Sequence, residues 1–445
     1  MKANKYLVFV ILFNLIGSTL CSQQVYFNNR YHLSGSESFY ASTSIFEYND
    51  NYYMTGATDD TINQSWRWVF FSIISDSGGV KSTKYLGNNA NDYYPAWPGS
   101  FAEHENNFFF AGNMRYYGPF HQAGLLVKLN SNLDTIWSKE YIGDLSLPYD
   151  SNQHFNNMHI CEDGSFIFTG ELYYGQQPSQ MVLLKADTSG NQQWVKYFGA
   201  TGLNAGYSVI QTSDDGFAIG GFWYVPGSSE YTGDPIVIKT DSLGNKEWEK
   251  NLGGPHQDNS AILYTGPDGS IIVGTLYADS MSGNNPIHGD PYSRIHIVKL
   301  DIEGNVLWDK KYGKSDYKYN YLTNIRCLDN GSIIACGTRP RGWPIPPGRS
   351  GWAMKVTADG DSLWYRYYEL LLGENSQNQL KDIIPTSDNG FLACGYVFPM
   401  QPDTGTQDAW VIKLDSMGCD TPGCSTGVGI ENPPSPVPRT PYLQI

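Results

Sequence analysis

Acidic residues recur beside glycine in this chain, and carboxylates are the usual acids and bases of glycoside hydrolysis. One series ends in Gly directly: Asp163-Gly164, Asp215-Gly216 and Asp268-Gly269, with Asn330-Gly331 and Asn389-Gly390 in the same role. A second series has Gly three residues after Asp, at Asp187–Gly190, Asp241–Gly244, Asp301–Gly304 and Asp415–Gly418. Asp bonds forward to backbone N–H groups and Gly supplies positive φ, so both series are typical of tight turns. Their regular recurrence favours turn formation over catalysis, and no carboxylate pair stands out.

Two histidine-containing loops carry groups that bind metals. His256 precedes Asp258 and Asn259, and His288 precedes Asp290. Their spacing matches neither a zinc nor a calcium site, so we interpret them as solvated loop residues and expect no metal and no cofactor. A nucleophile elbow, a phosphate loop and HExxH are also missing from the sequence.

Aromatic residues gather in loops, among Asn, Asp, Gln and Ser. Rings with amphipathic edges beside short polar groups suit recognition of carbohydrate or protein. The alternative is that many of these rings only seal the bases of the loops. The longest loops, 275–294 and 338–351, are expected to carry specificity. The predicted ligand-binding residues are Tyr116, Tyr117, Tyr173, Tyr174, Trp223, Tyr224, Tyr292 and Trp343.

The elements that hold these loops form a repeat of about fifty residues, clearest from Tyr207 to Gly254. It contains four short apolar or alternating runs bounded by turn residues, which predicts a four-stranded antiparallel meander. Its third strand carries a Lys and its fourth a Trp nine residues later, so this hairpin keeps a fixed length. The lysines are Lys128, Lys185, Lys239, Lys299, Lys355 and Lys413, and the tryptophans are Trp137, Trp194, Trp248, Trp308 and Trp364.

Seven copies of the unit are expected, including degenerate ones that start near Ala41 and Gly99. The last copy ends after Gly418 without a fourth strand, whereas Val25–Tyr31 resembles a fourth strand and precedes the first copy. The sequence therefore predicts an all-β, seven-bladed β-propeller of four-stranded antiparallel blades, whose last blade is closed by the N-terminal strand beside 410–415.

The flanks predict three regions: a signal peptide at 1–22, the propeller at 23–418 and a Cys/Pro-rich linker or tail at 419–445. Residues 1–22 have a basic start and a short apolar run, which is typical of secretion, and no later run is long enough for a transmembrane segment. A lipoprotein signal that anchors the chain at Cys21 is the alternative. We expect a secreted or outer-surface protein.

Seven cysteines are present. Cys419 and Cys424 flank a short Pro-Gly loop and are the disulfide candidates, since export permits a disulfide. Cys327 and Cys336 flank a turn and are expected near one another on neighbouring strands. Cys161 and Cys394 are expected as buried free thiols.

The composition restricts the class of partner. Net charge is −15, only 16% of residues are charged, and Lys and Arg do not cluster, so nucleic acid is not expected as a partner. We expect a monomer that meets a glycan or a protein at the extracellular surface.

The repeat pattern D-x-x-G-x-x-x-W resembles that of secreted Bacteroidota β-propellers near the quinoprotein alcohol dehydrogenase-like superfamily. The closing GCDTPGC resembles the junction before a type IX secretion sorting domain, and that domain is not in the sequence. The resemblance implies a propeller in which Trp137, Trp194, Trp248, Trp308 and Trp364 dock on the neighbouring blade. A quinone cofactor would need a calcium-held carboxylate and, often, vicinal cysteines; neither is identifiable. The turns also depart from sialidase spacing, and no arginine triad can be assigned.

The leading hypothesis is a non-catalytic propeller that binds glycan or protein through its long-loop face, with no catalytic residue. One alternative is a glycan-active hydrolase or lyase that uses acidic residues in the central cleft. The other is a structural module of a larger surface protein.

Overall fold

The computed structural model describes residues 25–33, 40–59, 67–88, 90–116, 121–143, 151–174, 179–199, 202–224, 233–254, 256, 258–281, 291–313, 320–341, 348–400, 404–422 and 424. The predicted signal peptide, Cys21 and nearly all of the tail after 422 lie outside these ranges. Among the described residues every regular element is a strand. No helix in those ranges has the length and apolar character needed to cross a membrane.

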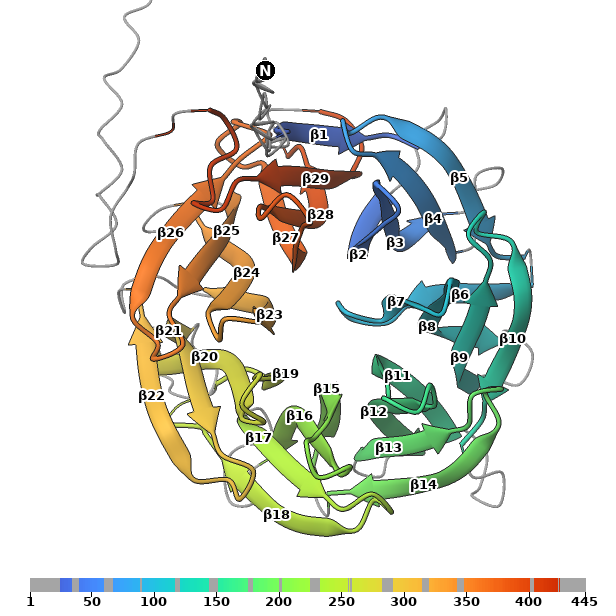
Figure 1. Cartoon of the computed structure of the whole chain (residues 1–445). Coiled ribbons are helices and arrows are strands. Elements are labelled where there is room, and N and C mark those ends of the chain that lie inside the picture. The colour runs from blue at the N-terminus through green and yellow to red at the C-terminus, as the bar shows by residue number, and fades with distance from the viewer. Residues whose placement is uncertain are drawn as a thin grey trace, which may run out of the picture.

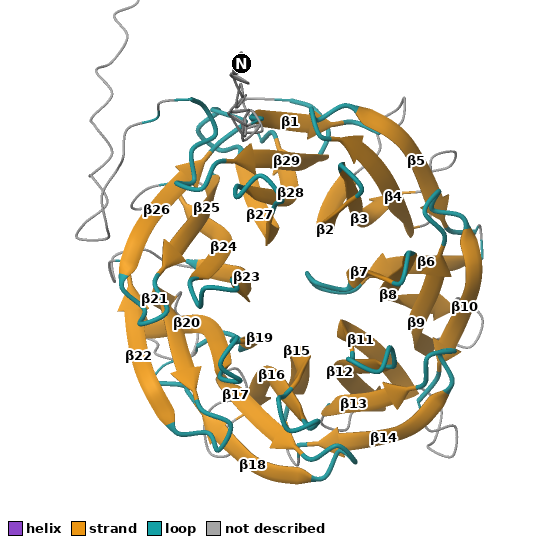
Figure 2. Cartoon of the chain, in the orientation of Figure 1, coloured by secondary structure: helices purple, strands orange, loops and turns teal. Residues whose placement is uncertain are grey.

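Four-stranded antiparallel sheets repeat along most of the chain (Figures 1 and 2). Listed from the centre of the ring outward they are β2 (Tyr40–Tyr48), β3 (Asn51–Asp59), β4 (Arg67–Ser75) and β5 (Val80–Leu86); β11 (Ser151–Ile160), β12 (Phe166–Tyr174), β13 (Gln180–Ala186) and β14 (Gln192–Phe198); β15 (Asn204–Gln211), β16 (Phe217–Tyr224), β17 (Gly233–Thr240) and β18 (Lys246–Asn251); and β19 (Ile262–Thr265), β20 (Ile271–Met281), β21 (Pro291–Leu300) and β22 (Val306–Tyr312).

One sheet has a divided innermost strand. Both β6 (Asn91–Pro95) and β7 (Phe101–His104) pair with β8 (Asn107–Tyr116), and β9 (His121–Leu129) and β10 (Thr135–Tyr141) follow outward. The predicted start of this unit near Gly99 was therefore wrong, because the sheet begins at Asn91. Pro95 and Pro98 flank the break, and proline cannot donate to a strand ladder.

The remaining strands form a mixed eight-stranded sheet with two antiparallel halves. One half contains β23 (Tyr321–Cys327), β24 (Ile333–Pro340), β25 (Arg349–Val356) and β26 (Ser362–Tyr368), and the other β27 (Gln377–Pro385), β28 (Phe391–Phe398), β29 (Asp408–Leu414) and β1 (Phe27–Tyr31). The halves join at a parallel pairing of Arg349 with Gln377. The sheets stand around a common axis, which is the arrangement of a β-propeller (Figure 1).

The N-terminal strand completes the last half-sheet. Phe27 lies opposite Lys413 and Tyr31 opposite Ala409, which confirms the predicted pairing with 410–415. Phe27 and Tyr31 are buried in one cluster with Tyr52 and Phe70 of the first sheet and Val411 of the last. The first and last segments of the ring therefore share one core.

The cores lie between neighbouring sheets. Phe71 of one sheet meets Phe110 of the next edge-on, with ring centroids 5.2 Å apart, and other clusters repeat this arrangement around the ring. Third strands are buried on both faces because each sheet lies between two neighbouring sheets. This burial explains continuous apolar runs such as VLLKA in β13. Fourth strands are partly solvated and alternate, as in β10.

Fourth-strand tryptophans reach the next turn along the ring. Trp248 Nε1 donates to Ile302 O at 3.0 Å and Trp308 Nε1 to Ala358 O at 3.0 Å. Trp364 Nε1 donates to Ser416 O at 3.2 Å. Each ring lies against the turn that follows the third strand of the next unit.

The repeated aspartates are turn residues. Asp241 Oδ1 accepts the backbone N–H of Asn245 at 2.8 Å, and Asp187, Asp301 and Asp415 do the same in their turns. In the first-hairpin turns, Lys299 Nζ lies 2.7 Å from Asp268 Oδ2 and Lys413 Nζ 2.7 Å from Asp388 Oδ2. Although partial burial opposes the change, hydrogen bonds from Lys299 and Ser270 lower the pKa of Asp268 to about 2. The interpretation of these groups as turn formers is confirmed.

The predicted disulfide between Cys419 and Cys424 is formed. Cys161, Cys336 and Cys394 are buried free thiols, and Cys327 is free and half-buried. Cys327 and Cys336 lie on the neighbouring strands β23 and β24, as expected, but not near one another. Cys327 lies opposite Ile333 and Cys336 opposite Asn324, so the two thiols stand about three strand positions, or roughly 10 Å, apart.

Candidate functional site

Innermost strands of five units carry a β-bulge at the same position. The pairing register shifts by one residue there and leaves one residue unpaired. A bulge turns a side chain away from the regular alternation of the strand. The unpaired residues are Thr43, Asn156, Tyr207, Thr323 and Lys381.

A glycine in the second strand faces each of these bulges. A Cβ added at Gly395 would lie 1.8 Å from Gln379 O, and one at Gly337 would lie 1.9 Å from Tyr321 O. Gly56, Gly170 and Gly221 meet backbone oxygens in the same way. The second strand therefore approaches the bulge too closely for any side chain.

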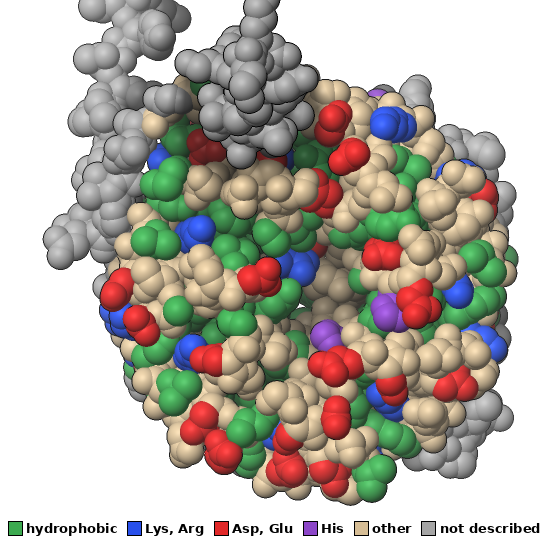
Figure 3. All heavy atoms as spheres, viewed as in Figure 1, with side chains coloured by type: hydrophobic (Ala, Val, Ile, Leu, Met, Phe, Trp, Pro, Cys, Tyr) green, Lys and Arg blue, Asp and Glu red, His purple; other side chains and the backbone are tan. Residues whose placement is uncertain are grey.

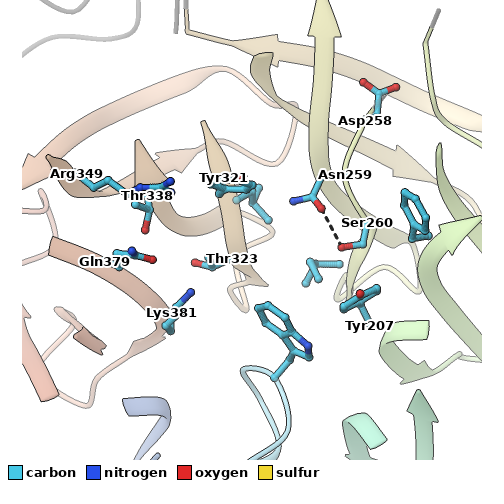
Figure 4. Close-up of a pocket in the computed structure, with 14 residues that line it drawn as sticks. Tyr207, Asp258, Asn259, Ser260, Tyr321, Thr323, Thr338, Arg349, Gln379 and Lys381 are labelled. Carbon is cyan, nitrogen blue, oxygen red and sulfur yellow. Dashed lines mark hydrogen bonds between the residues drawn. The ribbon is translucent and has the colours of Figure 1, made fainter. Parts of the chain in front are cut away.

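Three of the bulge residues, Tyr207, Thr323 and Lys381, line a cavity of about 450 Å3 (Figure 4). Tyr321 and Arg349 are the first residues of β23 and β25, and Thr338 lies near the end of β24. The cavity thus adjoins the side of the ring on which the second strands end and the third strands begin. Its lining comprises Trp97, Tyr207, Phe222, Asp258, Asn259, Ser260, Ile262, Tyr321, Leu322, Thr323, Thr338, Arg349, Gln379 and Lys381.

Lys381 reaches the cavity from the middle of β27 (Figure 4). Its ammonium lies 5.8 Å from the ring centroid of Trp97 and 5.5 Å from that of Tyr396. Among the described residues no carboxylate oxygen lies within 4.0 Å of it. Burial, followed by repulsion from Arg349, lowers the pKa of Lys381 to about 8.

The residue after the bulge anchors this strand. Asp382 is fully buried, and its Oδ1 lies 3.0 Å from Arg326 Nη2 and 2.5 Å from Asn324 Nδ2. Its Oδ2 accepts the backbone N–H of Ile45 at 3.2 Å. Since Asp382 is tied to β23 on one side and β2 on the other, it positions Lys381 and is itself not available to a ligand.

Arg349 is the second cation of the cavity. Its guanidinium carbon lies 5.6 Å from the ring centroid of Tyr321. The backbone holds it on both sides, since its N–H donates to Ser376 O at 3.1 Å and its C=O accepts from Asn378 Nδ2 at 3.1 Å. No carboxylate among the described residues pairs with it either.

Trp97 enters from the break between β6 and β7. Its backbone N–H donates to Asn156 O at 2.8 Å, and its ring meets that of Tyr207 edge-on at 5.7 Å. The side chain is 43% exposed, which is unusual for tryptophan in a chain with so many buried rings. It gives the cavity an apolar face open to a ligand.

Asp258 is the acidic residue of the cavity lining. Its two oxygens accept backbone N–H groups, from Gly254 at 2.6 Å and from Ala278 at 2.5 Å. Burial raises the pKa of Asp258 to about 6. In Figure 4 it lies across the cavity from Lys381, so it does not neutralise that ammonium.

Of the two suggested metal loops, His288 and Asp290 lie outside the described residues, and no three metal-binding side chains cluster within the described ranges.

The predicted binding residues are spread around the ring. Tyr116 contacts Glu140 through its hydroxyl and stacks on His121 at 4.2 Å, and Tyr173 donates to Glu171 Oε1 at 2.8 Å. Trp223 is partly buried against the core of its sheet, and Tyr292 is near the start of β21. None of these four lines the cavity. Tyr117 and Trp343, and the side chains of Tyr174 and Tyr224, lie outside the description, so the binding role stays a prediction.

The sequence analysis did not identify Thr323 and Lys381 as cavity residues, although the sequence contains a signal for them. Glycine in the middle of a strand marks a bulge or a close backbone approach. Gly170, Gly221, Gly337 and Gly395 recur once per unit and point to the bulges opposite them. Finding Lys381 and Thr323 would have required pairing each glycine with the preceding strand. The proximity of Arg349 and Trp97 had no local signal.

No protein-family model matches the chain. The regulatory protein FlaEY of Caulobacter vibrioides is 25% identical over 195 residues, which are 40% of this chain and 20% of that protein. The chain thus spans about a fifth of the length of this relative.

Solved structures with a similar backbone fold include YCF48 bound to D1 peptide. It is 10% identical with TM-score 0.44, and the match covers 87% of this chain and 99% of that one. The polysaccharide lyase Uly1 is 10% identical with TM-score 0.45, over 84% of this chain and 90% of its own. The β-propeller domain of the Trilobed protease from Pyrococcus furiosus is 9% identical with TM-score 0.43, over 84% and 95%. At these scores no activity is carried over to this chain.

Proposed function

We propose that the protein is an exported, non-catalytic β-propeller that binds a glycan in its central cavity. The observation that carries this proposal is Trp97, a 43% exposed ring held beside Tyr207 at the mouth of a cavity of about 450 Å3. An apolar ring face with hydrogen-bonding groups around it is the usual arrangement of a small-molecule site. This cavity adjoins the side on which the long loops begin.

The polar lining favours a saccharide. Gln379, Asn259 and Thr323 present amide and hydroxyl groups of both donor and acceptor type, as a ring bearing several hydroxyls requires. The volume is within the range of small-ligand pockets, whereas a protein surface would bury a wider area.

Acid–base hydrolysis is less well supported. Hydrolases of glycosides use two carboxyl groups on opposite sides of the bond. In the described lining Asp258 is the one carboxyl group, and both its oxygens accept backbone N–H groups.

The architecture that we propose is a ring of seven blades, closed by the N-terminal strand. Counting β23–β26 and β27–β29 with β1 as separate blades is supported by the single parallel residue pair between them. Export, a position at the outer cell surface and a monomeric state are parts of the same proposal, as is a type IX route.

A glycan array followed by calorimetry tests this function. Trp97→Ala is expected to weaken saccharide binding about tenfold or more, since it removes the burial of one large aromatic face. Phe398→Ala is the matched control, because Phe398 is 36% exposed and lies outside the cavity lining. Absence of saccharide binding, or equal affinity of wild type and Trp97→Ala, would contradict the proposal. Release of cleaved or unsaturated products would overturn its non-catalytic part.

A further inference from the structure

We infer that the ligand is an acidic saccharide, whose carboxylate or sulfate group is held between Lys381 and Arg349. This inference rests on the proposed glycan binding and names the class of glycan. Its basis is two cations in one cavity without a counter-charge among the described residues.

Several buried cations elsewhere in the chain are paired with carboxylates. Lys239 and Lys413 are fully buried, and each has a carboxylate oxygen 2.7 Å from its ammonium. Arg326, also largely buried, pairs with Asp382 at 3.0 Å. Lys381 and Arg349 are half-buried and have no carboxylate oxygen within 4.0 Å among the described residues, so their charges are available to an anionic ligand, although the protein carries a net charge of −15.

The two cations also repel one another. Arg349 is one reason why the pKa of Lys381 is lowered, after burial itself. An anion between them would offset this repulsion. Its charge-assisted hydrogen bonds would replace the hydration that the two cations lose in the cavity. Asp258 does not serve as that anion, because it lies across the cavity from Lys381 (Figure 4).

The neighbours of Lys381 favour a sugar over an acidic peptide. Its ammonium lies 5.8 Å from the Trp97 ring centroid, so one ligand ring could lie on the tryptophan face with its charged group on the lysine. Thr323 and Gln379 lie beside Lys381 in the lining, within reach of hydroxyls on the same ring (Figure 4). On the face seen in Figure 3, which is viewed as in Figure 1, Asp and Glu side chains are spread around the central hollow. Their negative charge disfavours binding of an anion to this face outside the cavity.

The experiment measures affinity of the full chain by calorimetry for four probes. These are an oligosaccharide containing uronic acid, a sulfated oligosaccharide, a neutral oligosaccharide of equal length and an acidic peptide. We expect one or both acidic saccharides to bind at least tenfold more tightly than the neutral one, with affinity falling as salt rises. Lys381→Gln and Arg349→Gln are each expected to reduce that affinity about tenfold or more, as loss of a charge-assisted contact implies.

The control variants are Lys196→Gln and Arg366→Gln, which change the same charges on the outer strands β14 and β26. They are expected to retain wild-type affinity and should report any effect of net charge alone. Circular dichroism and melting temperature check that each cavity variant is folded. If Lys381→Gln does not fold, Lys381→Arg is measured in its place, and because it keeps the positive charge it is expected to keep the preference for the acidic saccharide.

The outcomes separate the two proposals. If a saccharide binds through Trp97 but acidic and neutral forms bind alike, or Lys381→Gln and Arg349→Gln have no effect, glycan binding stands and the acidic ligand is overturned. If no saccharide binds, the proposed function fails, and the inference fails with it. Tight binding of the acidic peptide alone would overturn the saccharide in favour of a protein partner.

Discussion

Lys381 is a cation held in place by its neighbours in the strand. Leu380 is fully buried in the core, and Asp382 is fully buried in a network with Arg326. The side chain of Lys381 between them therefore points into the cavity. The bulge makes this possible, because it adds one residue without changing which neighbours face the core. A charge is thus placed in the cavity by its position in the strand.

The lowered pKa of Lys381 predicts a pH-dependent affinity for an anionic ligand. The amine is charged below its pKa of about 8 and neutral above it, so affinity should be constant up to about pH 8 and then fall about tenfold per pH unit. Of the groups facing it, Arg349 remains charged, and burial raises the pKa of the Cys336 thiol to about 12, so neither titrates in this range. Burial likewise raises the pKa of Tyr396.

Calorimetry with the acidic saccharide between pH 7 and 10 measures this dependence. Lys381→Arg serves as the control, because arginine stays charged and should give a flat profile. A flat profile for the wild type would show that Lys381 does not contact the anion.

At the scale of elements, the hairpin of third and fourth strands is the rigid part of each unit. Its turn glycine has positive φ, 76° at Gly244 and 83° at Gly304, and the tryptophan of the preceding unit lies against it. The constant length between Lys and Trp in the sequence follows from this contact, since an insertion would move the turn away from its tryptophan.

Gly244→Ala is expected to destabilise the protein. The substitution forces a side chain into positive φ and places Cβ 2.8 Å from the Trp194 ring, which together should lower the free energy of unfolding by about 1–3 kcal/mol. Gly79→Ala, in an exposed turn at ordinary φ with its nearest contact at 3.3 Å, should change it little. Urea denaturation measures both, and equal effects would mean that the tryptophan contact is not needed.

For the whole molecule, closure determines whether the ring has open edges. β29 has β28 on one side and β1 on the other, and without β1 its backbone groups would be exposed to pairing with other chains. Phe27 and Tyr31 also fill the core shared by the first and last sheets.

Deleting residues 25–33 should therefore lower the free energy of unfolding by about 4 kcal/mol, which corresponds to burial of two large aromatic side chains, and should promote aggregation. Thermal denaturation and light scattering measure the effect. A synthetic peptide of residues 25–33 added in trans should restore stability, as in other cases of strand addition, and a scrambled peptide should not. An unchanged melting temperature would show that β1 does not hold the ring.

Much of the fold could be predicted because it depends on local chemistry. Turn aspartates and glycines, and the alternation of β10, are decided within a few residues, and the partner of β29 followed from a missing strand. The start of the second unit was mispredicted because the break at Trp97 leaves two short pieces that both pair with β8. The cavity could not be predicted, since its residues come from strands far apart in the chain.

The sequence by itself determined the repeat, the four-stranded meander and the strand that completes the last half-sheet, because a periodic pattern of short-range preferences specifies each of them. Only the tertiary structure decided that Trp97, Arg349 and Lys381 share one cavity, in which no carboxylate of the described residues lies beside the two cations. The physical reason is that desolvation and charge act through space: whether a cation is neutralised depends on how neighbouring sheets pack around the axis, and no single unit of the repeat contains that information.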